Sequence, residues 1–584
     1  MITAKLLAVP VIFSITVLIT PSLVSADSEG TLLYKRAPDN EENGYPRVIQ
    51  LQHAGDMNGK FLATWEHWYT TDPTSGKPNG TAGNFIIRES DNGNDWTHLA
   101  TVHDPQKGPG NPRPFFYQLF LFEFPQKLGK YPAGTILLVG NLVNSTSTEF
   151  VAWRSQDHGK TWDVVGPWQN GSITDKAGGG IWEPFLYLDN KGRLLAYFSD
   201  ERNPKEHSQM LVHVVSEDGG DTWSREVARD VASNKKSDRP GMASVAKMDN
   251  GEYFMSYELC EEVNANCPVH GKTSPDGASW TPSDVGTVIG TADDISLWAS
   301  PNTVWDPSTK QLLVAAQNQY LDNTNGEVSP EQHRAVLINT QHGKGEWVWA
   351  PSPWTASTEG SYSSNRSPNL IPLPDGTIRY SAAAGQGQPG HCSEWTGKAP
   401  IGALPYKANF AANGQAGWIN FGGKWSTTDD KYSFEPTKNA SAVAVTGSSG
   451  WTDYEVSADV MISGDSGEVG LLSRVSASKT GLNSLKKYTA TISSASGNVT
   501  ISKEGDASTV LHSEKHPGGI KGNKWYHLLF SVQTKKLTVT LTGDKGVSKT
   551  SFTSTDGTFP QGMAGLVGDN GSGSFKNVQI KKLT

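Results

Sequence analysis

Two glutamates stand at the ends of apolar segments that are typical of β-strands. Glu183 lies in GGGIWEPFLY, between Trp182 and Pro184, and Glu258 lies near the end of GEYFMSYELC. Two facing carboxyl groups can hydrolyse a glycosidic bond, one as acid/base and the other as nucleophile or base, and a retaining glycosidase holds them about 5–5.5 Å apart. The apolar neighbours of Glu183 would raise its pKa and suit it to donate a proton.

Both glutamates also have a plainer interpretation. Each could form an ion pair with a nearby arginine, such as Arg202 or Arg239, and serve only the scaffold. Their matched positions at the ends of neighbouring strands favour the catalytic interpretation. The two interpretations differ in one structural respect, which is whether the carboxyl groups share a cavity or lie apart in separate ion pairs.

Several polar and aromatic residues are candidates for binding a sugar. Trp182 could stack against a sugar ring. Six further residues could hydrogen-bond hydroxyl groups, with a structural role equally open for each: Arg47, Glu66, Arg239, Gln317, Tyr362 and Arg366. The 14 histidines and three cysteines show no metal-ligand spacing, so we expect no metal in the site and no cofactor.

These residues lie in a repeat of six hairpins. Each unit opens with a proline and an alternating apolar segment, passes through a turn such as DNG or PDG, and closes with a second apolar segment. The units open at Pro46, Pro114, Pro184, Pro240, Pro301 and Pro368. Their first segments are expected to begin at Arg47, Arg113, Glu183, Arg239, Ser300 and Ser367. Their second segments are expected to end near Glu66, Asn141, 200–202, Glu258, Gln317 and Ala383.

A second repeat follows the hairpins. The turns SQDHGKTW and SEDGGDTW, which end at Trp162 and Trp223, share the pattern S-x-D-x-G-x-T-W, and weaker copies end at Trp96 and Trp280. Asp and Ser can bond turn amides, Gly permits a positive φ and Trp packs between strands, so the pattern predicts scaffold. Two hairpins in each of six units predict a six-bladed β-propeller. Its inner hairpins converge on the axis, which would bring the two glutamates, from adjacent blades, to one face.

The four turns resemble the Asp boxes, or BNR repeats, of the sialidase superfamily, over roughly residues 30–405. Sialidases bind a carboxylate with three arginines and use a tyrosine nucleophile activated by a glutamate. Arg47, Arg239 and Arg366 could fill the arginine positions, but no Tyr–Glu pair has the sialidase sequence context. Asp boxes also occur in propellers without activity. A sialidase, or a non-catalytic carbohydrate-binding propeller, therefore remains an alternative.

A closer resemblance is to glycoside hydrolase family 93, and it is carried by IWEPFLYLDNKGRLLAYFSDER and RPGMASVAKMDNGEYFMSYELC. Members of that family are secreted fungal exo-α-1,5-L-arabinanases with a six-bladed propeller. They release arabinobiose from the non-reducing end of linear arabinan with retention. The resemblance implies that Glu183 is the acid/base and Glu258 the nucleophile, and that plant cell-wall arabinan is the substrate. We also expect the chain to act as a monomer.

The N-terminal 30 residues predict export. One Lys precedes an apolar run that ends in Val24-Ser25-Ala26, which predicts a signal peptide over 1–26 and a secreted glycoprotein. Six N-x-S/T sequons would then be open to glycans, at Asn79, Asn144, Asn170, Asn439, Asn498 and Asn570. Cys260 and Cys267 are close enough for a small disulfide loop, and Cys392 is left over.

The composition changes near residue 405. Short alternating segments rich in Ser, Thr, Lys and Gly follow, which predicts a propeller domain over 27–405 and a β-sandwich over 406–584. The run GNKWYHLLFSVQTKKLTVTLTGD resembles laminin-G or concanavalin-like jelly rolls. Such a module could hold polysaccharide or only pack on the propeller. The net charge of -9 and the lack of a later apolar run of 18 residues predict no binding to nucleic acid and no membrane span.

Overall fold

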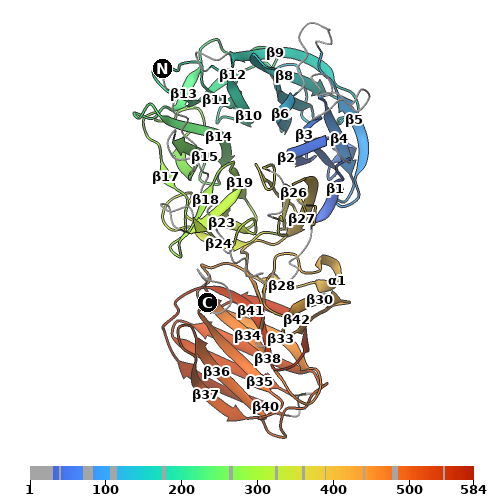
Figure 1. Ribbon diagram of the computed structural model, residues 1–584, viewed down its shortest axis with the longest axis vertical. Helices are drawn as coiled ribbons and strands as arrows, with labels where there is room; N and C mark the ends of the chain where they lie inside the picture. Colours follow the sequence, from blue (N-terminus) through green and yellow to red (C-terminus); the bar gives the residue numbers. More distant parts are fainter. Residues whose placement is uncertain are drawn as a thin grey trace, which may run out of the picture.

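The computed structural model is built almost entirely from β-strands (Figure 1). It describes residues 30–37, 41–69, 83–105, 115–173, 179–261, 267–321, 327–329, 331–357, 362–388, 390–437, 441–476, 485–543, 546 and 548–583. Within these ranges the helical elements are η1 (Gly55–Met57) and α1 (Phe410–Asn413), and no helix is long enough to cross a membrane. The predicted signal segment and the sequons at Asn79 and Asn439 lie outside these ranges.

Six four-stranded antiparallel sheets form a ring of blades, in the upper part of Figure 1. Blade one comprises β2 (Glu41–Gln50), β3 (Phe61–Tyr69), β4 (Phe85–Ser90) and β5 (Thr97–Val102). Blade two comprises β6 (Phe115–Glu123), β7 (Ile136–Val143), β8 (Ser147–Ser155) and β9 (Asp163–Ser172). Blade three comprises β10 (Ile181–Leu188), β11 (Leu194–Asp200), β12 (Met210–Ser216) and β13 (Ala228–Val231).

The remaining blades close the ring. Blade four comprises β14 (Asp238–Lys247), β15 (Tyr253–Glu261), β16 (Val269–Ser274) and β17 (Thr287–Val288). Blade five comprises β19 (Asn302–Asp306), β20 (Gln311–Ala315), β23 (Ala335–Asn339) and β24 (Val348–Pro351), beside a small sheet of β18 (Ile295–Trp298), β21 (Asn318–Leu321) and β22 (Glu327–Val328). Blade six comprises β25 (Asn369–Pro372), β26 (Ile378–Ala384) and β27 (Ser393–Ala399), and its outer strand is β1 (Thr31–Tyr34). Because β1 precedes blade one in the chain, its pairing with β27 joins the two ends of the ring.

The S-x-D-x-G-x-T-W turns stabilise the outer hairpins. In the first, the Gly159 amide donates to Ser155 Oγ at 2.8 Å and Thr161 Oγ1 donates to Asp157 Oδ2 at 2.6 Å. The Trp162 indole N–H donates to the Gly159 carbonyl at 2.9 Å, and Gly159 has φ +90°. These turns lie beyond β8 and the equivalent strands, outside the lining of the central cavity.

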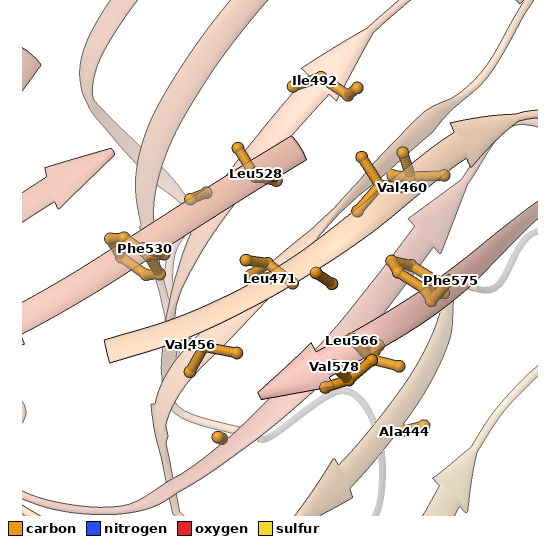
Figure 2. Packing of buried hydrophobic residues seen from close by; sticks show 14 of the residues in the cluster. Ala444, Val456, Val460, Leu471, Ile492, Leu528, Phe530, Leu566, Phe575 and Val578 are labelled. Atoms are coloured by element: carbon orange, nitrogen blue, oxygen red, sulfur yellow. The ribbon is translucent and has the colours of Figure 1, made fainter. Parts of the chain in front are cut away.

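The C-terminal part packs two sheets face to face, in the lower part of Figure 1. The first sheet contains β28 (Tyr406–Lys407), β30 (Lys424–Thr428), β31 (Lys431–Glu435), β33 (Tyr454–Ile462), β38 (Tyr526–Gln533), β39 (Lys536–Thr542), β40 (Lys549–Thr555) and β42 (Gly573–Lys582). The second contains β29 (Ile419–Phe421), β32 (Ala442–Thr446), β34 (Glu468–Val475), β35 (Lys487–Ser493), β36 (Asn498–Glu504), β37 (Thr509–Lys515) and β41 (Met563–Asp569). Buried and partly exposed residues alternate along β33, and Figure 2 shows its Val456 and Val460 packed in the apolar core with Leu528 and Phe530 of β38.

An apolar cluster joins the sandwich to the propeller. Leu312 and Trp349 of blade five and Phe421 and Leu472 of the sandwich belong to one buried cluster. The Trp349 amide donates to Ser449 Oγ at 3.0 Å, and the Ser449 amide donates to the Trp349 carbonyl at 2.8 Å. The prediction of an all-β chain, with a six-bladed propeller followed by a β-sandwich, is confirmed.

Candidate active site

A cavity of about 660 Å³ opens where the inner hairpins of the propeller meet. Residues from blades one to four and from the segment before β25 line it: Glu42, Glu66, Trp68, Tyr117, Gln118, Trp182, Glu183, Glu201, Gln209, Arg239, Glu258, Cys260, Tyr362, Ser363 and Arg366. Both predicted catalytic glutamates face this cavity together with Trp182, Glu66, Arg239, Tyr362 and Arg366. Arg47 and Gln317 do not line it.

One residue at the start of each inner hairpin has a left-handed backbone. These residues are Tyr45, Gln118, Glu183, Met242, Ser300 and Ser367, with φ between +48° and +57°. In the first four blades the residue lies at a shift of register between the inner and second strands, and in the last two it lies just before the inner strand. A bulge re-aims a side chain that regular pleating would point elsewhere. Because all six blades share the feature, it belongs to the fold.

The bulges correct the expected strand starts. Tyr45 and Met242, rather than Arg47 and Arg239, occupy the positions equivalent to Glu183. This residue directly precedes the proline in blades one, three, five and six, but it follows Pro240 by two positions and Pro114 by four, so no fixed offset from the proline locates it. In blade two the equivalent residue is Gln118, and Arg113 lies outside the described residues.

Glu183 accepts hydrogen bonds at both carboxyl oxygens. Gln118 Nε2 donates to Oε1 at 2.9 Å, and Ser199 Oγ donates to Oε2 at 2.6 Å. Burial raises the pKa of Glu183 to about 8, and Glu258 adds to the rise, whereas Ser199 and Arg366 oppose it. Glu183 is therefore largely protonated at neutral pH, which suits a general acid.

Glu258 lies on β15, opposite Gly241 of β14. The Ser300 amide of blade five donates to its Oε2 at 2.8 Å. Burial raises the pKa of Glu258, although this hydrogen bond, Arg366 and Arg239 oppose the rise. Among the described residues, no Lys, Arg or His nitrogen lies within 4.0 Å of the Glu183 or Glu258 carboxyl groups, so the ion-pair interpretation is not supported.

Gly241 lies beside the Glu258 carboxyl group and beside Ser199, the hydrogen-bond donor to Glu183. A Cβ added there would lie 3.4 Å from Ser199 Oγ, which binds Glu183, and 3.5 Å from Glu258 Oε1. The same Cβ would lie only 2.7 Å from Gln209 Nε2. The absence of a side chain at this position therefore keeps open the space beside Ser199 and Glu258.

Arg366 lies among three carboxyl groups. Glu66, Glu183 and Glu258 all raise the pKa of this guanidinium, which more than offsets the lowering by burial. Its charge opposes the rise in the pKa of each of these glutamates. The guanidinium also lies 4.7 Å from the centre of the Tyr362 ring. Arg366 thus balances the charge of the cavity without forming an ion pair within 4.0 Å to a described glutamate.

Two other predicted binding residues, Arg47 and Arg239, form hydrogen bonds or ion pairs with protein groups. Arg47 is 5% exposed and donates from Nη2 to Ser367 Oγ at 2.8 Å and from Nη1 to the Pro46 carbonyl at 2.7 Å. Arg239 pairs with Glu201 and donates to Gln209 Oε1 at 2.8 Å.

Gln317 and Glu66 also bind protein groups. Gln317 Nε2 donates to the carbonyls of Tyr362 and Ser364, at 2.9 and 3.3 Å, and so supports the segment that carries Arg366. Glu66 Oε1 accepts from the Gln118 amide at 2.7 Å. Both residues therefore position other parts of the cavity wall.

Aromatic side chains and a disulfide complete the wall. Trp182, Trp68, Tyr117 and Tyr362 line the cavity, and Tyr362 is 75% exposed. Trp68 and Tyr117 meet edge to face with centroids 5.3 Å apart. Such rings offer apolar faces to a sugar. At the rim, Cys260 forms a disulfide with Cys267, while Cys392 is buried elsewhere.

Sequence reasoning missed three residues near the glutamates, Gln118, Ser199 and Gly241, and gave Asn141 only as a strand end. Gln118 carried a signal, because it is a lone carboxamide inside the apolar run FFYQLFLFE. Ser199 and Gly241 carried none, since Ser199 meets Glu183 across a register shift between β10 and β11 and Gly241 approaches Ser199 from the next blade. No group of three or more His, Cys, Asp or Glu among the described residues is arranged to hold a metal ion.

Known proteins resemble both the propeller and the C-terminal sandwich of this chain. Residues 434–582 match the family model described as galactocerebrosidase, C-terminal lectin domain. An α-L-arabinanase from Penicillium chrysogenum, solved with arabinobiose, is 28% identical with a TM-score of 0.50, covering 64% of this chain and 98% of that one. The family 93 α-L-arabinofuranosidase of Fusarium graminearum, also with arabinobiose, is 24% identical with a TM-score of 0.52 and the same coverage. No curated protein sequence gives a significant match.

The predicted resemblance to glycoside hydrolase family 93 is confirmed by these structures. At 24% identity, the Fusarium protein shows a shared fold alone. The Penicillium protein, at 28% identity, is similar in sequence as well as in fold. The structural neighbours of this chain are glycoside hydrolases, which supports a glycosidase.

Proposed function

We propose that this chain is a secreted, retaining exo-glycosidase that hydrolyses linear α-1,5-L-arabinan from the non-reducing end and releases arabinobiose. One observation carries the proposal. Glu183 and Glu258 face a single cavity on adjacent blades, and neither forms an ion pair within 4.0 Å to a described residue. The likeness to an arabinanase solved with arabinobiose supports the choice of substrate.

The raised pKa of Glu183 supports its role as the acid, and Glu258 is then left as the nucleophile. Glu183, with a pKa of about 8, would give its proton to the glycosidic oxygen as the bond to the sugar carbon breaks. A Glu258 carboxylate oxygen would bond to that carbon and form a covalent glycosyl intermediate. Water would then displace Glu258 after losing its proton to Glu183, which restores both groups.

The contacts of the three arginines do not favour the sialidase alternative. Recognition of a sialic acid carboxylate would need three guanidinium groups that converge on an empty position. Arg47 is instead bonded to Ser367, Arg239 to Glu201, and Arg366 lies among carboxyl groups. Five glutamates and two arginines line the cavity, a balance that favours a neutral sugar.

For the C-terminal sandwich we propose carbohydrate binding. The match to a family model named as a lectin domain supports this role. The apolar cluster shared with the propeller supports the alternative, in which the sandwich mainly stabilises the enzyme. Binding of debranched arabinan by the full chain carrying Glu183→Gln, compared before and after substitutions on the sandwich surface, separates the two.

We further propose export, with a signal peptide over 1–26, and glycans at exposed sequons. Asn170 and Asn570 are exposed, whereas Asn144 is 5% exposed and its side chain accepts from the Thr146 and Ser147 amides. Peptide mapping of the secreted protein should therefore find glycans at the first two sites and none at Asn144.

A substrate panel tests the activity. Purified chain is incubated with linear debranched arabinan, a sialylated oligosaccharide and polygalacturonan, and the products are separated by size. We expect arabinobiose as the first product from arabinan and no product from the two anionic glycans. Release of sialic acid would support the sialidase alternative, and no release from any glycan would support a non-catalytic propeller.

A further inference from the structure

Gln118 connects Glu183 to blade two through its carboxamide. Gln118 Nε2 donates to Glu183 Oε1 at 2.9 Å, and Gln118 Oε1 accepts from the Glu183 amide at 3.2 Å. Gln118 is 6% exposed, and its own amide donates to Glu66 Oε1 at 2.7 Å. The carboxamide therefore hydrogen-bonds both the side chain and the main chain of Glu183, and Glu66 fixes the backbone of Gln118.

Asn141 determines which way round this carboxamide lies. Asn141 Nδ2 donates to Gln118 Oε1 at 3.0 Å and to the Ile181 carbonyl at 2.9 Å. A flipped Asn141 would turn its oxygen toward the Ile181 carbonyl, which cannot donate. With Asn141 oriented by the main chain, Gln118 must present its oxygen to Asn141 and its NH₂ group to Glu183.

We propose that Gln118 is a positioning residue that keeps Glu183 Oε1 a hydrogen-bond acceptor and thereby makes Oε2 the oxygen that donates the proton to the glycosidic bond. The inference rests on the proposed function, in which Glu183 is the acid. A proton on Oε1 would face the N–H of Gln118, which has no lone pair to accept it. A proton on Oε2 faces Ser199 Oγ, which can accept as well as donate and lies on the side of Gly241 and Glu258.

Gln118→Glu tests this assignment with almost no change of shape. Asn141 Nδ2 and the Glu183 amide would hydrogen-bond the substituted side chain and stabilise its carboxylate form. Its other oxygen would then accept from Glu183, which moves the Glu183 proton from Oε2 to Oε1. We expect kcat on arabinan to fall about 100-fold or more, the scale of general acid catalysis, with KM changed less than about threefold.

A substrate with a good leaving group distinguishes a misplaced Glu183 proton from general damage to the active site. An aryl glycoside of arabinobiose needs little protonation, so Gln118→Glu should retain far more kcat on it than on arabinan. Asn302→Asp is the matched control, because Asn302 is a buried amide that joins blades five and six by accepting from the Leu370 amide at 2.8 Å. It should keep wild-type kcat on both substrates. Equal losses on both substrates in Gln118→Glu would overturn the proposal.

Infrared difference titration of the unliganded enzyme provides a readout that needs no turnover. The band of the protonated Glu183 carboxyl, assigned by its loss in Glu183→Gln, should change frequency in Gln118→Glu, because its hydrogen-bond partner changes. A changed band in a chain that does not cleave arabinan supports the positioning role and rejects the proposed function alone. An unchanged band, with arabinan cleavage intact in the wild type, overturns the positioning role alone.

Discussion

Ser199→Ala should raise the pKa of Glu183 and shift the pH dependence of activity. Ser199 Oγ donates to Glu183 Oε2 at 2.6 Å, and this bond opposes the rise in pKa that burial causes. A hydrogen bond to a charged group contributes about 1.5–3 kcal/mol, and one pKa unit corresponds to about 1.4 kcal/mol. Its loss should therefore raise the pKa by about one to two units, from about 8 in the wild type.

The assay is the pH dependence of kcat/KM on linear arabinan, which reports groups of the free enzyme. A general acid loses activity as it deprotonates, so the basic limb should lie near pH 8 in the wild type and about one unit or more higher in Ser199→Ala. Ser256→Ala is the matched control, because Ser256 is equally buried on the neighbouring second strand and bonds Thr303. A basic limb that stays in place or moves to lower pH in Ser199→Ala would refute the reasoning.

Three further changes test the cavity, a buried acid and the domain interface. Gly241→Ala places a methyl group 2.7 Å from Gln209 Nε2 and 3.5 Å from Glu258 Oε1. We expect kcat/KM to fall by about tenfold or more at an unchanged melting temperature, and wild-type kcat/KM would contradict this. Glu394 is 0% exposed, neither carboxyl oxygen has a hydrogen-bond partner among the described residues, and burial, then Glu66 and Glu41, raise its pKa well above the usual value. The unfolded chain releases this proton near pH 4.3, so the free energy of unfolding of the wild type falls by up to about 1.4 kcal/mol for each pH unit above that value. Glu394→Gln lacks this loss, and its melting temperature should exceed that of the wild type by a margin that grows from pH 4 to pH 8. A constant or shrinking margin would contradict the prediction. Phe421→Ala should lower the free energy of unfolding by about 3–5 kcal/mol and split the calorimetric transition into separate transitions of the propeller and the sandwich. Val510→Ala, at a 63% exposed position, should do neither. A single unshifted transition in Phe421→Ala would contradict a coupled interface.

The fold could be predicted because its signals are local and repeated. Alternating segments joined by a turn recur six times, and each forms the inner hairpin of a blade. The S-x-D-x-G-x-T-W turns are equally local, since their hydrogen bonds join residues within five positions of one another. The break near residue 405 was visible as a change of composition, between β27 and β28.

The cavity wall was only partly predictable, because it depends on bulges and on contacts between blades. The bulge in β14 puts Met242 where counting from Pro240 suggested Arg239, and Arg239 then pairs with Glu201, which lies 38 positions earlier. Glu183 could be found because it is itself the bulge residue that precedes a proline. Ser199 could not, because it meets Glu183 across the register shift between β10 and β11, which the sequence does not reveal.

The central claim is that Glu183 and Glu258 act together on one glycosidic bond. The most direct test is the time course of arabinobiose release from linear debranched arabinan by the wild type, Glu183→Gln and Glu258→Gln, with folding checked by melting temperature. We predict that both variants fold and that each loses turnover by about 100-fold or more. Wild-type release by either folded variant would contradict the account.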